Sequence, residues 1–127
     1  MKLTLRIAAI INLAVAVVHT FVGEASVVAP LMGSDAPDLV KATLHSAWHM
    51  ISVVLYLSSL TLFYVSRKDV TDPAVTLLPG YIGIQYVGLA MVFVVTSVIY
   101  GQFFPQIVML LPIGLLSLWA ARMATKA

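Results

Sequence analysis

The stretch from Val40 to Val65 reads VKATLHSAWHMISVVLYLSSLTLFYV and decides the fold class. It is almost continuously apolar, and its residues do not alternate between polar and apolar. A helix needs about 20 residues to cross a hydrocarbon layer of about 30 Å, and this stretch exceeds that length. A strand of a membrane barrel would alternate with a period of two, so the stretch predicts a transmembrane helix.

Three further stretches of this kind accompany it, and the sequence places transmembrane helices at 3–22, 40–65, 79–100 and 103–121. The 127 residues are 61% hydrophobic and 9% charged, which leaves too few charges for the surface of a soluble domain. We therefore expect an all-α integral membrane protein in the lipid bilayer. It should be a single domain over 1–127, an antiparallel up-down-up-down bundle with an outer loop at 23–39.

The basic residues predict the orientation. Threading four helices places most of them on one side: Lys2, Arg6, Arg67, Lys68, Arg122 and Lys126. Lys41 falls on the other side with the acidic residues Glu24, Asp35 and Asp38. The positive-inside rule then predicts that both termini are cytoplasmic. The first apolar run could also be read as a signal peptide, but its length favours a spanning helix.

Composition narrows the chemistry. The net charge is only +2, so the basic pI is no argument for a nucleic-acid partner, and we expect none. The chain has no cysteine, which excludes disulfides, thiolate metal sites and thiol nucleophiles. Phosphate-binding loops, dinucleotide fingerprints and hydrolase elbows are not found in the sequence. Function must therefore be sought among the few polar residues of the helices.

All three histidines lie on the first two predicted helices, at their outer ends. His45 and His49 are four residues apart and share one helix face, while His19 lies at a similar depth on the first helix. Glu24 follows close after His19. Because polar side chains in hydrocarbon turn towards the protein interior, we expect these four residues to converge.

Three imidazoles and a carboxylate form a ligand set that Zn, Fe or Cu accepts. The leading hypothesis is therefore a metal or metallocofactor site at the periplasmic end of the first two helices, built from His19, Glu24, His45 and His49. A haem b group held by His19 with His45 or His49 is an alternative. A further alternative is that the same groups only hydrogen-bond to each other and tie two helices together.

Other classes of function stay open. The chain could be a non-catalytic subunit or scaffold of a larger membrane complex, or a small transporter subunit acting as a homo-oligomer. Gly83, Gly88 and Gly114 allow close helix contacts within or between protomers. Trp48 is expected to serve in packing, and Gln106 lies at the level where a pocket mouth could form. The sequence does not decide whether the protein is an enzyme.

The pattern His19-x3-Gly23-Glu24, with Pro30-Leu31 and Trp48-His49, resembles that of short four-helix bacterial inner-membrane proteins of unassigned function. The resemblance covers about the first half of the chain and its motifs are short. It implies a multi-pass protein of the bacterial inner (plasma) membrane and supports the choice of site residues. It implies no activity.

Overall fold

The computed structural model describes residues 1–126, and its long elements are all helices. In chain order the elements are α1 (Lys2–Val17), η1 (Val18–Val28), α2 (Ala29–Met32), α3 (Asp38–Val65), α4 (Ala74–Tyr100) and α5 (Gln106–Ala124). The first three run on without interruption and form one helical segment, Lys2–Met32. With α3, α4 and α5 this gives four segments that are long and apolar enough to cross a membrane. The expected all-α four-helix bundle is confirmed.

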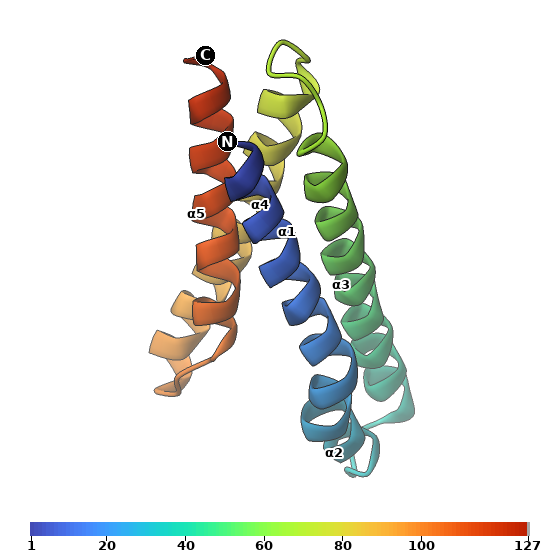
Figure 1. Cartoon of the computed structure of the whole chain (residues 1–127). Helices are drawn as coiled ribbons and strands as arrows, with labels where there is room; N and C mark the ends of the chain where they lie inside the picture. Colours follow the sequence, from blue (N-terminus) through green and yellow to red (C-terminus); the bar gives the residue numbers. More distant parts are fainter. Residues whose placement is uncertain (127) are drawn as a thin grey trace.

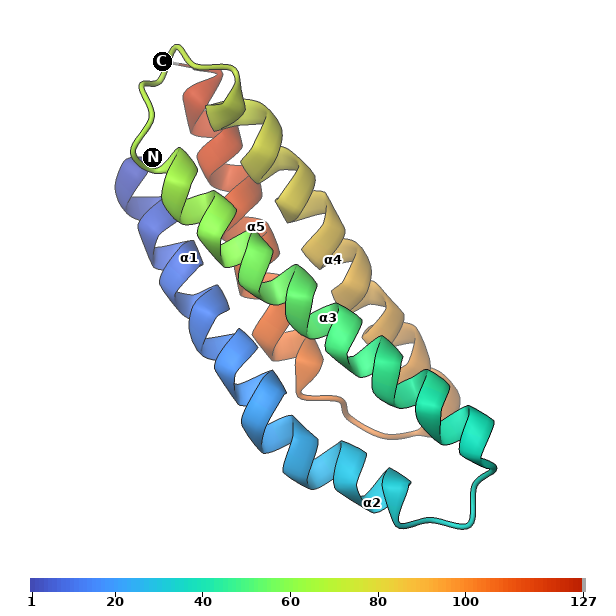
Figure 2. The same cartoon turned by 90° about the vertical axis from the view of Figure 1, so that its right-hand side faces the viewer.

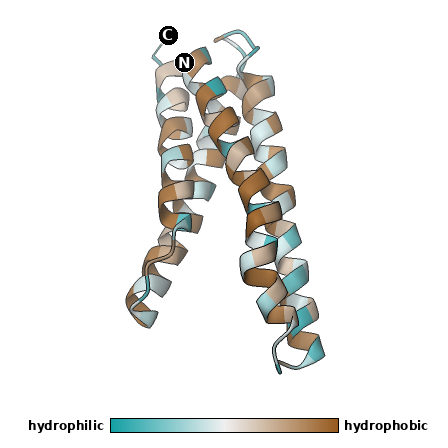
Figure 3. Ribbon diagram, turned by 60° about the horizontal axis from the view of Figure 1, so that its bottom comes forward, coloured by the Kyte–Doolittle hydropathy of each residue, from teal (hydrophilic) through white to brown (hydrophobic). Residues whose placement is uncertain are grey.

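The helices form two antiparallel hairpins, α1–α3 and α4–α5 (Figures 1 and 2). The hairpins lie together at the end that carries both termini and diverge towards the opposite end (Figure 1). Hydrophobic residues dominate the middle of the helices, and hydrophilic ones gather towards their ends and in the connections (Figure 3). We call the end with the termini the closed end, and the opposite end the open end.

The prediction of an outer loop at 23–39 is wrong for most of that range. The helix continues to Met32, so the connection to α3 is confined to residues 33–37. Gly23 lies within the helix and lets the indole of Trp48 approach, since a Cβ on Gly23 would overlap Trp48 Cζ2. The residues from Ala25 to Met32 remain apolar and contain no break before Gly33, so helical hydrogen bonding is the cheapest way to satisfy their backbone.

The third and fourth helices are also shifted from their expected positions. Helix α4 begins at Ala74 rather than at Pro79, and Pro79 lies inside it and is buried. Helix α5 covers Gln106–Ala124 rather than 103–121. Pro73 and Pro105 are the N-caps of these two helices. A proline is well tolerated at a helix start because its missing N–H would have no partner there in any case.

Close contact between α4 and α5 depends on two glycines. A Cβ on Gly83 would lie 2.9 Å from the carbonyl oxygen of Gly114. A Cβ on Gly114 would lie 3.0 Å from the backbone nitrogen of Val87. The two backbones therefore touch, as in the small-residue contacts of membrane helices. Gly88, in contrast, faces open space.

Small buried side chains also bring the hairpins together at the closed end. The alanines concerned are Ala8, Ala9, Ala120 and Ala124, each at most 8% exposed. Small side chains allow close approach of helix axes, and the dispersion contacts that follow stabilise helix pairs in lipid. The open end lacks such a layer, and larger side chains line the space between the hairpins there.

Three helices are joined at mid-height by a buried polar network. Asn12 Nδ2 donates to the carbonyl oxygen of Leu55 at 2.9 Å, and the hydroxyl of Tyr86 donates to Asn12 Oδ1 at 2.9 Å. Ser59 Oγ donates to the carbonyl oxygen of Ala9 at 2.8 Å. Asn12 and Tyr86 are both fully buried. Because each hydrogen-bonding group has a partner, this network links α1, α3 and α4 without a stranded polar atom.

Candidate functional site

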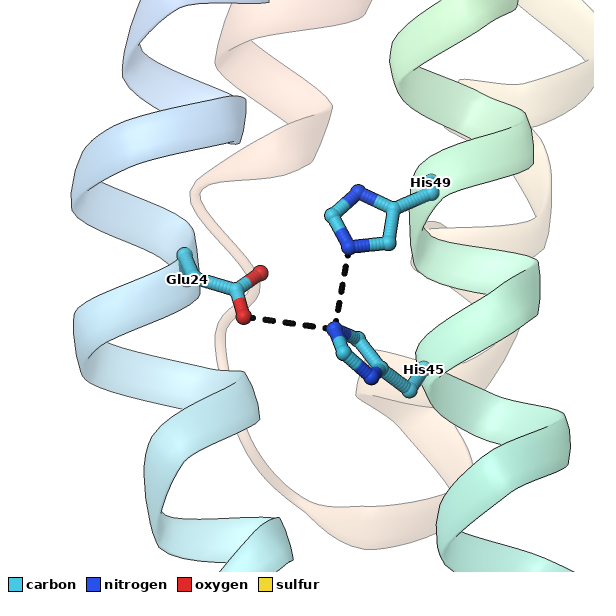
Figure 4. Close-up of side chains that lie close together, drawn as sticks. All are labelled: Glu24, His45 and His49. Atoms are coloured by element: carbon cyan, nitrogen blue, oxygen red, sulfur yellow. Dashed lines mark hydrogen bonds and ion pairs between the residues drawn. The ribbon is translucent and has the colours of Figure 1, made fainter.

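Glu24, His45 and His49 meet between η1 and α3 near the open end (Figure 4). Glu24 Oε1 lies 3.3 Å from His45 Nε2, and His49 Nε2 lies 2.9 Å from the same atom. The ligand atoms of the three residues all lie within 4.8 Å of one another. The pairing of His45 with His49 follows from their i, i+4 spacing on α3, which the sequence predicts. These three residues form a triad that could hold a metal ion.

The local geometry of η1 brings Glu24 to the histidines. Residues Val18–Val28 form a π-helix, in which each turn contains more residues than in an α-helix. The side chain of Glu24 is therefore displaced around the helix relative to α-helical geometry and reaches towards α3. Segments of this kind are frequent at functional sites because they re-aim side chains without ending the helix.

The contacts around His45 are hard to satisfy with protons alone. Nε2 of a neutral imidazole either donates a hydrogen bond or accepts one. If His45 Nε2 carries a proton, Glu24 and His49 must share it, and if it does not, its lone pair faces the carboxylate of Glu24. A cation would instead accept a lone pair from each of the three side chains. The arrangement is therefore one that could hold a metal ion.

The carboxylate of Glu24 also has an oxygen atom without a hydrogen-bond partner in the described part of the chain. Its Oε2 atom is buried and accepts no hydrogen bond from any residue in 1–126. Burying an unpaired carboxylate oxygen costs free energy, and a bound cation offsets that cost. The side chains of His45 and Glu24 are 35% and 38% exposed, so the triad as a whole remains accessible from outside.

His19 is not part of this triad. Its Nε2 atom lies 3.2 Å from the carbonyl oxygen of Trp48, and its ring stacks on the indole of Trp48 with centroids 4.0 Å apart. His19 and Trp48 line a cavity between the hairpins, whereas none of the triad residues does. The four-ligand arrangement expected from the sequence is therefore reduced to Glu24, His45 and His49. The axial haem pair of His19 with His45 or His49 gains no support from this placement.

The cavity has a volume of about 550 Å³ and takes its lining from all four long helical segments. Trp48, expected to serve only in packing, has a buried Nε1 atom without an acceptor in the described part of the chain. Gln106, expected at a pocket mouth, lines the same cavity. No pattern in the sequence predicts that the hairpins diverge here, because their relative tilt depends on packing at the closed end.

Three serines of α3 are buried as well. Ser52, Ser58 and Ser59 are at most 7% exposed. Ser59 is bonded to α1, and Ser52 Oγ lies 3.4 Å from the carbonyl oxygen of Trp48. Ser52 and Ser59 therefore have protein partners and require no ligand.

We compared the chain with protein-family models, curated proteins and solved structures, and none matches it. The site must therefore be judged on its own chemistry.

Proposed function

We propose that this protein binds a divalent transition metal through Glu24, His45 and His49, at the outer face of the membrane that it spans. One observation carries the proposal. Glu24 Oε1 and His49 Nε2 both lie close to His45 Nε2, at 3.3 and 2.9 Å, and a single proton on that nitrogen cannot make a good hydrogen bond to both. Two histidines and one carboxylate are the ligand set of many catalytic zinc sites and of non-haem Fe(II) sites. Copper is the third candidate.

The distances are close to those of a coordinated metal. Metal–nitrogen bonds of about 2.0–2.1 Å in tetrahedral geometry separate neighbouring ligand atoms by about 3.3 Å. The two contacts of His45 Nε2, at 2.9 and 3.3 Å, lie below and at that value, and all three ligand atoms lie within 4.8 Å of one another. Small side-chain rotations would therefore suffice to form the site. Three protein ligands leave a coordination position for water or another ligand, and a bound metal would supply a Lewis acid or redox centre there.

The height of the triad fits a site at the membrane surface. Twenty residues separate His45 from Val65, which is about 30 Å of helix and about the thickness of the hydrocarbon layer. With the cytoplasmic end of α3 near Arg67 and Lys68, His45 lies at the outer boundary. The positive-inside bias supports cytoplasmic termini and a periplasmic triad, in a bacterial inner membrane as the resemblance implies. There the metal can exchange with water-borne ions.

Elemental analysis of the purified protein tests the proposal. We expect a stoichiometric transition metal in the unaltered chain and its loss in His45→Ala and His49→Ala, with affinity lowered by at least about 100-fold. Glu24→Gln keeps the shape and removes the charge, so it should weaken binding less. A visible absorption spectrum recorded on the same sample distinguishes a metal ion from haem.

His19→Ala is the matched control, because it removes an imidazole at the same depth that is outside the triad. We expect its metal content to be unchanged. An equal loss of metal from His19→Ala and His49→Ala would instead support the four-ligand arrangement. Unchanged metal content in His45→Ala and His49→Ala, or no metal uptake by the unaltered chain on titration, would overturn the proposal.

Acidification gives an independent test. Protons compete with the metal for the imidazole nitrogens, so metal is released as the pH falls. We expect tight retention at pH 7.5 and release by about pH 5, where free imidazole is mostly protonated. Retention that does not change across this interval would argue against histidine ligands.

A further inference from the structure

The cavity at the open end has an apolar wall and few polar atoms. Val15, Leu55, Leu89, Phe93 and Leu110 contribute to its lining, and no Asp, Glu, Lys or Arg does. Its volume of about 550 Å³ lies in the range typical of small-molecule sites. An ion or a charged headgroup would be unpaired in such a place, so the occupant must be neutral and largely apolar.

His19 provides a hydrogen-bond acceptor in this cavity. A carbonyl oxygen only accepts, so the 3.2 Å contact with Trp48 assigns the proton of the neutral imidazole to Nε2. Nδ1 then carries a lone pair, and within residues 1–126 it has no hydrogen-bond partner. The ring is held in place by stacking on Trp48, with an interplanar angle of 13°. Nδ1 is therefore an acceptor on a ring that is held in place beside the cavity.

Trp48 and Gln106 supply two further polar groups. Trp48 Nε1, a donor, and Gln106 Oε1 are both buried and lack partners among residues 1–126. The amide of Gln106 can present its nitrogen in place of its oxygen by rotation about its last torsion. His19, Trp48 and Gln106 all border the cavity, so residues with one acceptor and two donors adjoin it. Unsatisfied groups of this kind cost free energy until a ligand pairs with them.

We infer that the cavity binds a neutral, single-chain amphiphile whose head carries a hydroxyl group. A hydroxyl donates one hydrogen bond and accepts another, so it can donate to His19 Nδ1 and accept from Gln106 or Trp48. The apolar chain would lie along the lining from Leu55 to Leu89. The cavity lies between the hairpins at the end where they diverge (Figure 1).

Quenching of Trp48 fluorescence tests this inference. The chain contains two tryptophans, so Trp119→Phe leaves Trp48 as the only one. A dibrominated long-chain alcohol added to this variant in detergent should quench Trp48 saturably, and the unbrominated alcohol should reverse the quenching. The matching methyl ether cannot donate to His19 and should bind about 10-fold more weakly.

Two further variants, made in the same background, locate the binding. Ala47 lines the cavity, whereas Ala42 lies on the same helix outside it. Ala47→Phe should lower the apparent affinity at least about 10-fold by filling the space, and Ala42→Phe should leave it unchanged. His19→Phe keeps the stacked ring without the acceptor and should remove the preference for alcohol over ether. His49→Ala should have no effect, which separates this site from the metal triad.

Certain results would overturn the inference. If the protein that retains His19 bound the alcohol and the ether equally, only the apolar chain would be recognised. Quenching that rises without saturation, or that Ala47→Phe leaves intact, would mean that the bromine atoms reach Trp48 from the surrounding detergent.

Discussion

Most buried polar groups at the two ends of the bundle differ in whether they have a hydrogen-bond partner. Ser117 Oγ, in the half of α5 nearer the closed end, is an exception, because it has no partner among residues 1–126. At mid-height and towards the closed end, Asn12, Tyr86 and Ser59 are buried and bonded to one another or to backbone. At the open end, Glu24 Oε2, Trp48 Nε1 and Gln106 Oε1 are buried with no partner in residues 1–126. Satisfied polar groups in lipid hold helices together, and unsatisfied ones cost stability. We therefore assign structure to the first group and binding to the second.

Metal addition should produce the largest difference between the two ends. A ligand that binds only the folded state stabilises it by about 2.7 kcal/mol at a concentration 100 times its dissociation constant. We expect a gain of this size from Zn(II) in reversible unfolding measured in mixed micelles. The gain should vanish in His45→Ala, and Asn12→Leu should retain it. A gain of equal size in His45→Ala would place the metal elsewhere.

Asn12→Leu tests the satisfied end. It removes two buried hydrogen bonds and leaves the Tyr86 hydroxyl without its acceptor. We expect the free energy of unfolding to fall by roughly 1–3 kcal/mol without a change in metal affinity. Tyr86→Phe combined with Asn12→Leu should recover part of the loss, since no stranded hydroxyl remains. Loss of metal binding in Asn12→Leu would show that the two ends are coupled.

Gln106→Leu should have the smallest effect and the opposite sign. It replaces an amide whose Oε1 is buried without a partner by an apolar group of similar size. We expect stability to be unchanged or raised by about 0.5–1 kcal/mol, because an unpaired polar atom is removed. Unfolding in the same micelles measures this. A marked loss of stability would mean that Gln106 has a structural partner, and the contrast between the ends would fail there.

The sequence predicted the fold better than the site, for a physical reason. Hydrophobic length depends on local composition, so the four spans follow from it. The i, i+4 spacing of His45 and His49 is likewise local, and the contact that it predicts between the two side chains is confirmed. The placement of His19 depends on how α1 rotates against α3. That rotation is set by the contact of Gly23 with Trp48 and by the π-helical turns, which have no recognisable pattern in the sequence.

The geometry of the triad also depends on the number of residues in the π-helical segment from Val18 to Val28. Each residue of an α-helix advances about 100° around the axis. Deleting one residue between His19 and Glu24 would thus swing the carboxylate away from His45 while every span stayed long enough to cross the bilayer. A single-codon insertion or deletion could therefore create or abolish this site in a descendant protein, and the membrane architecture would survive the change.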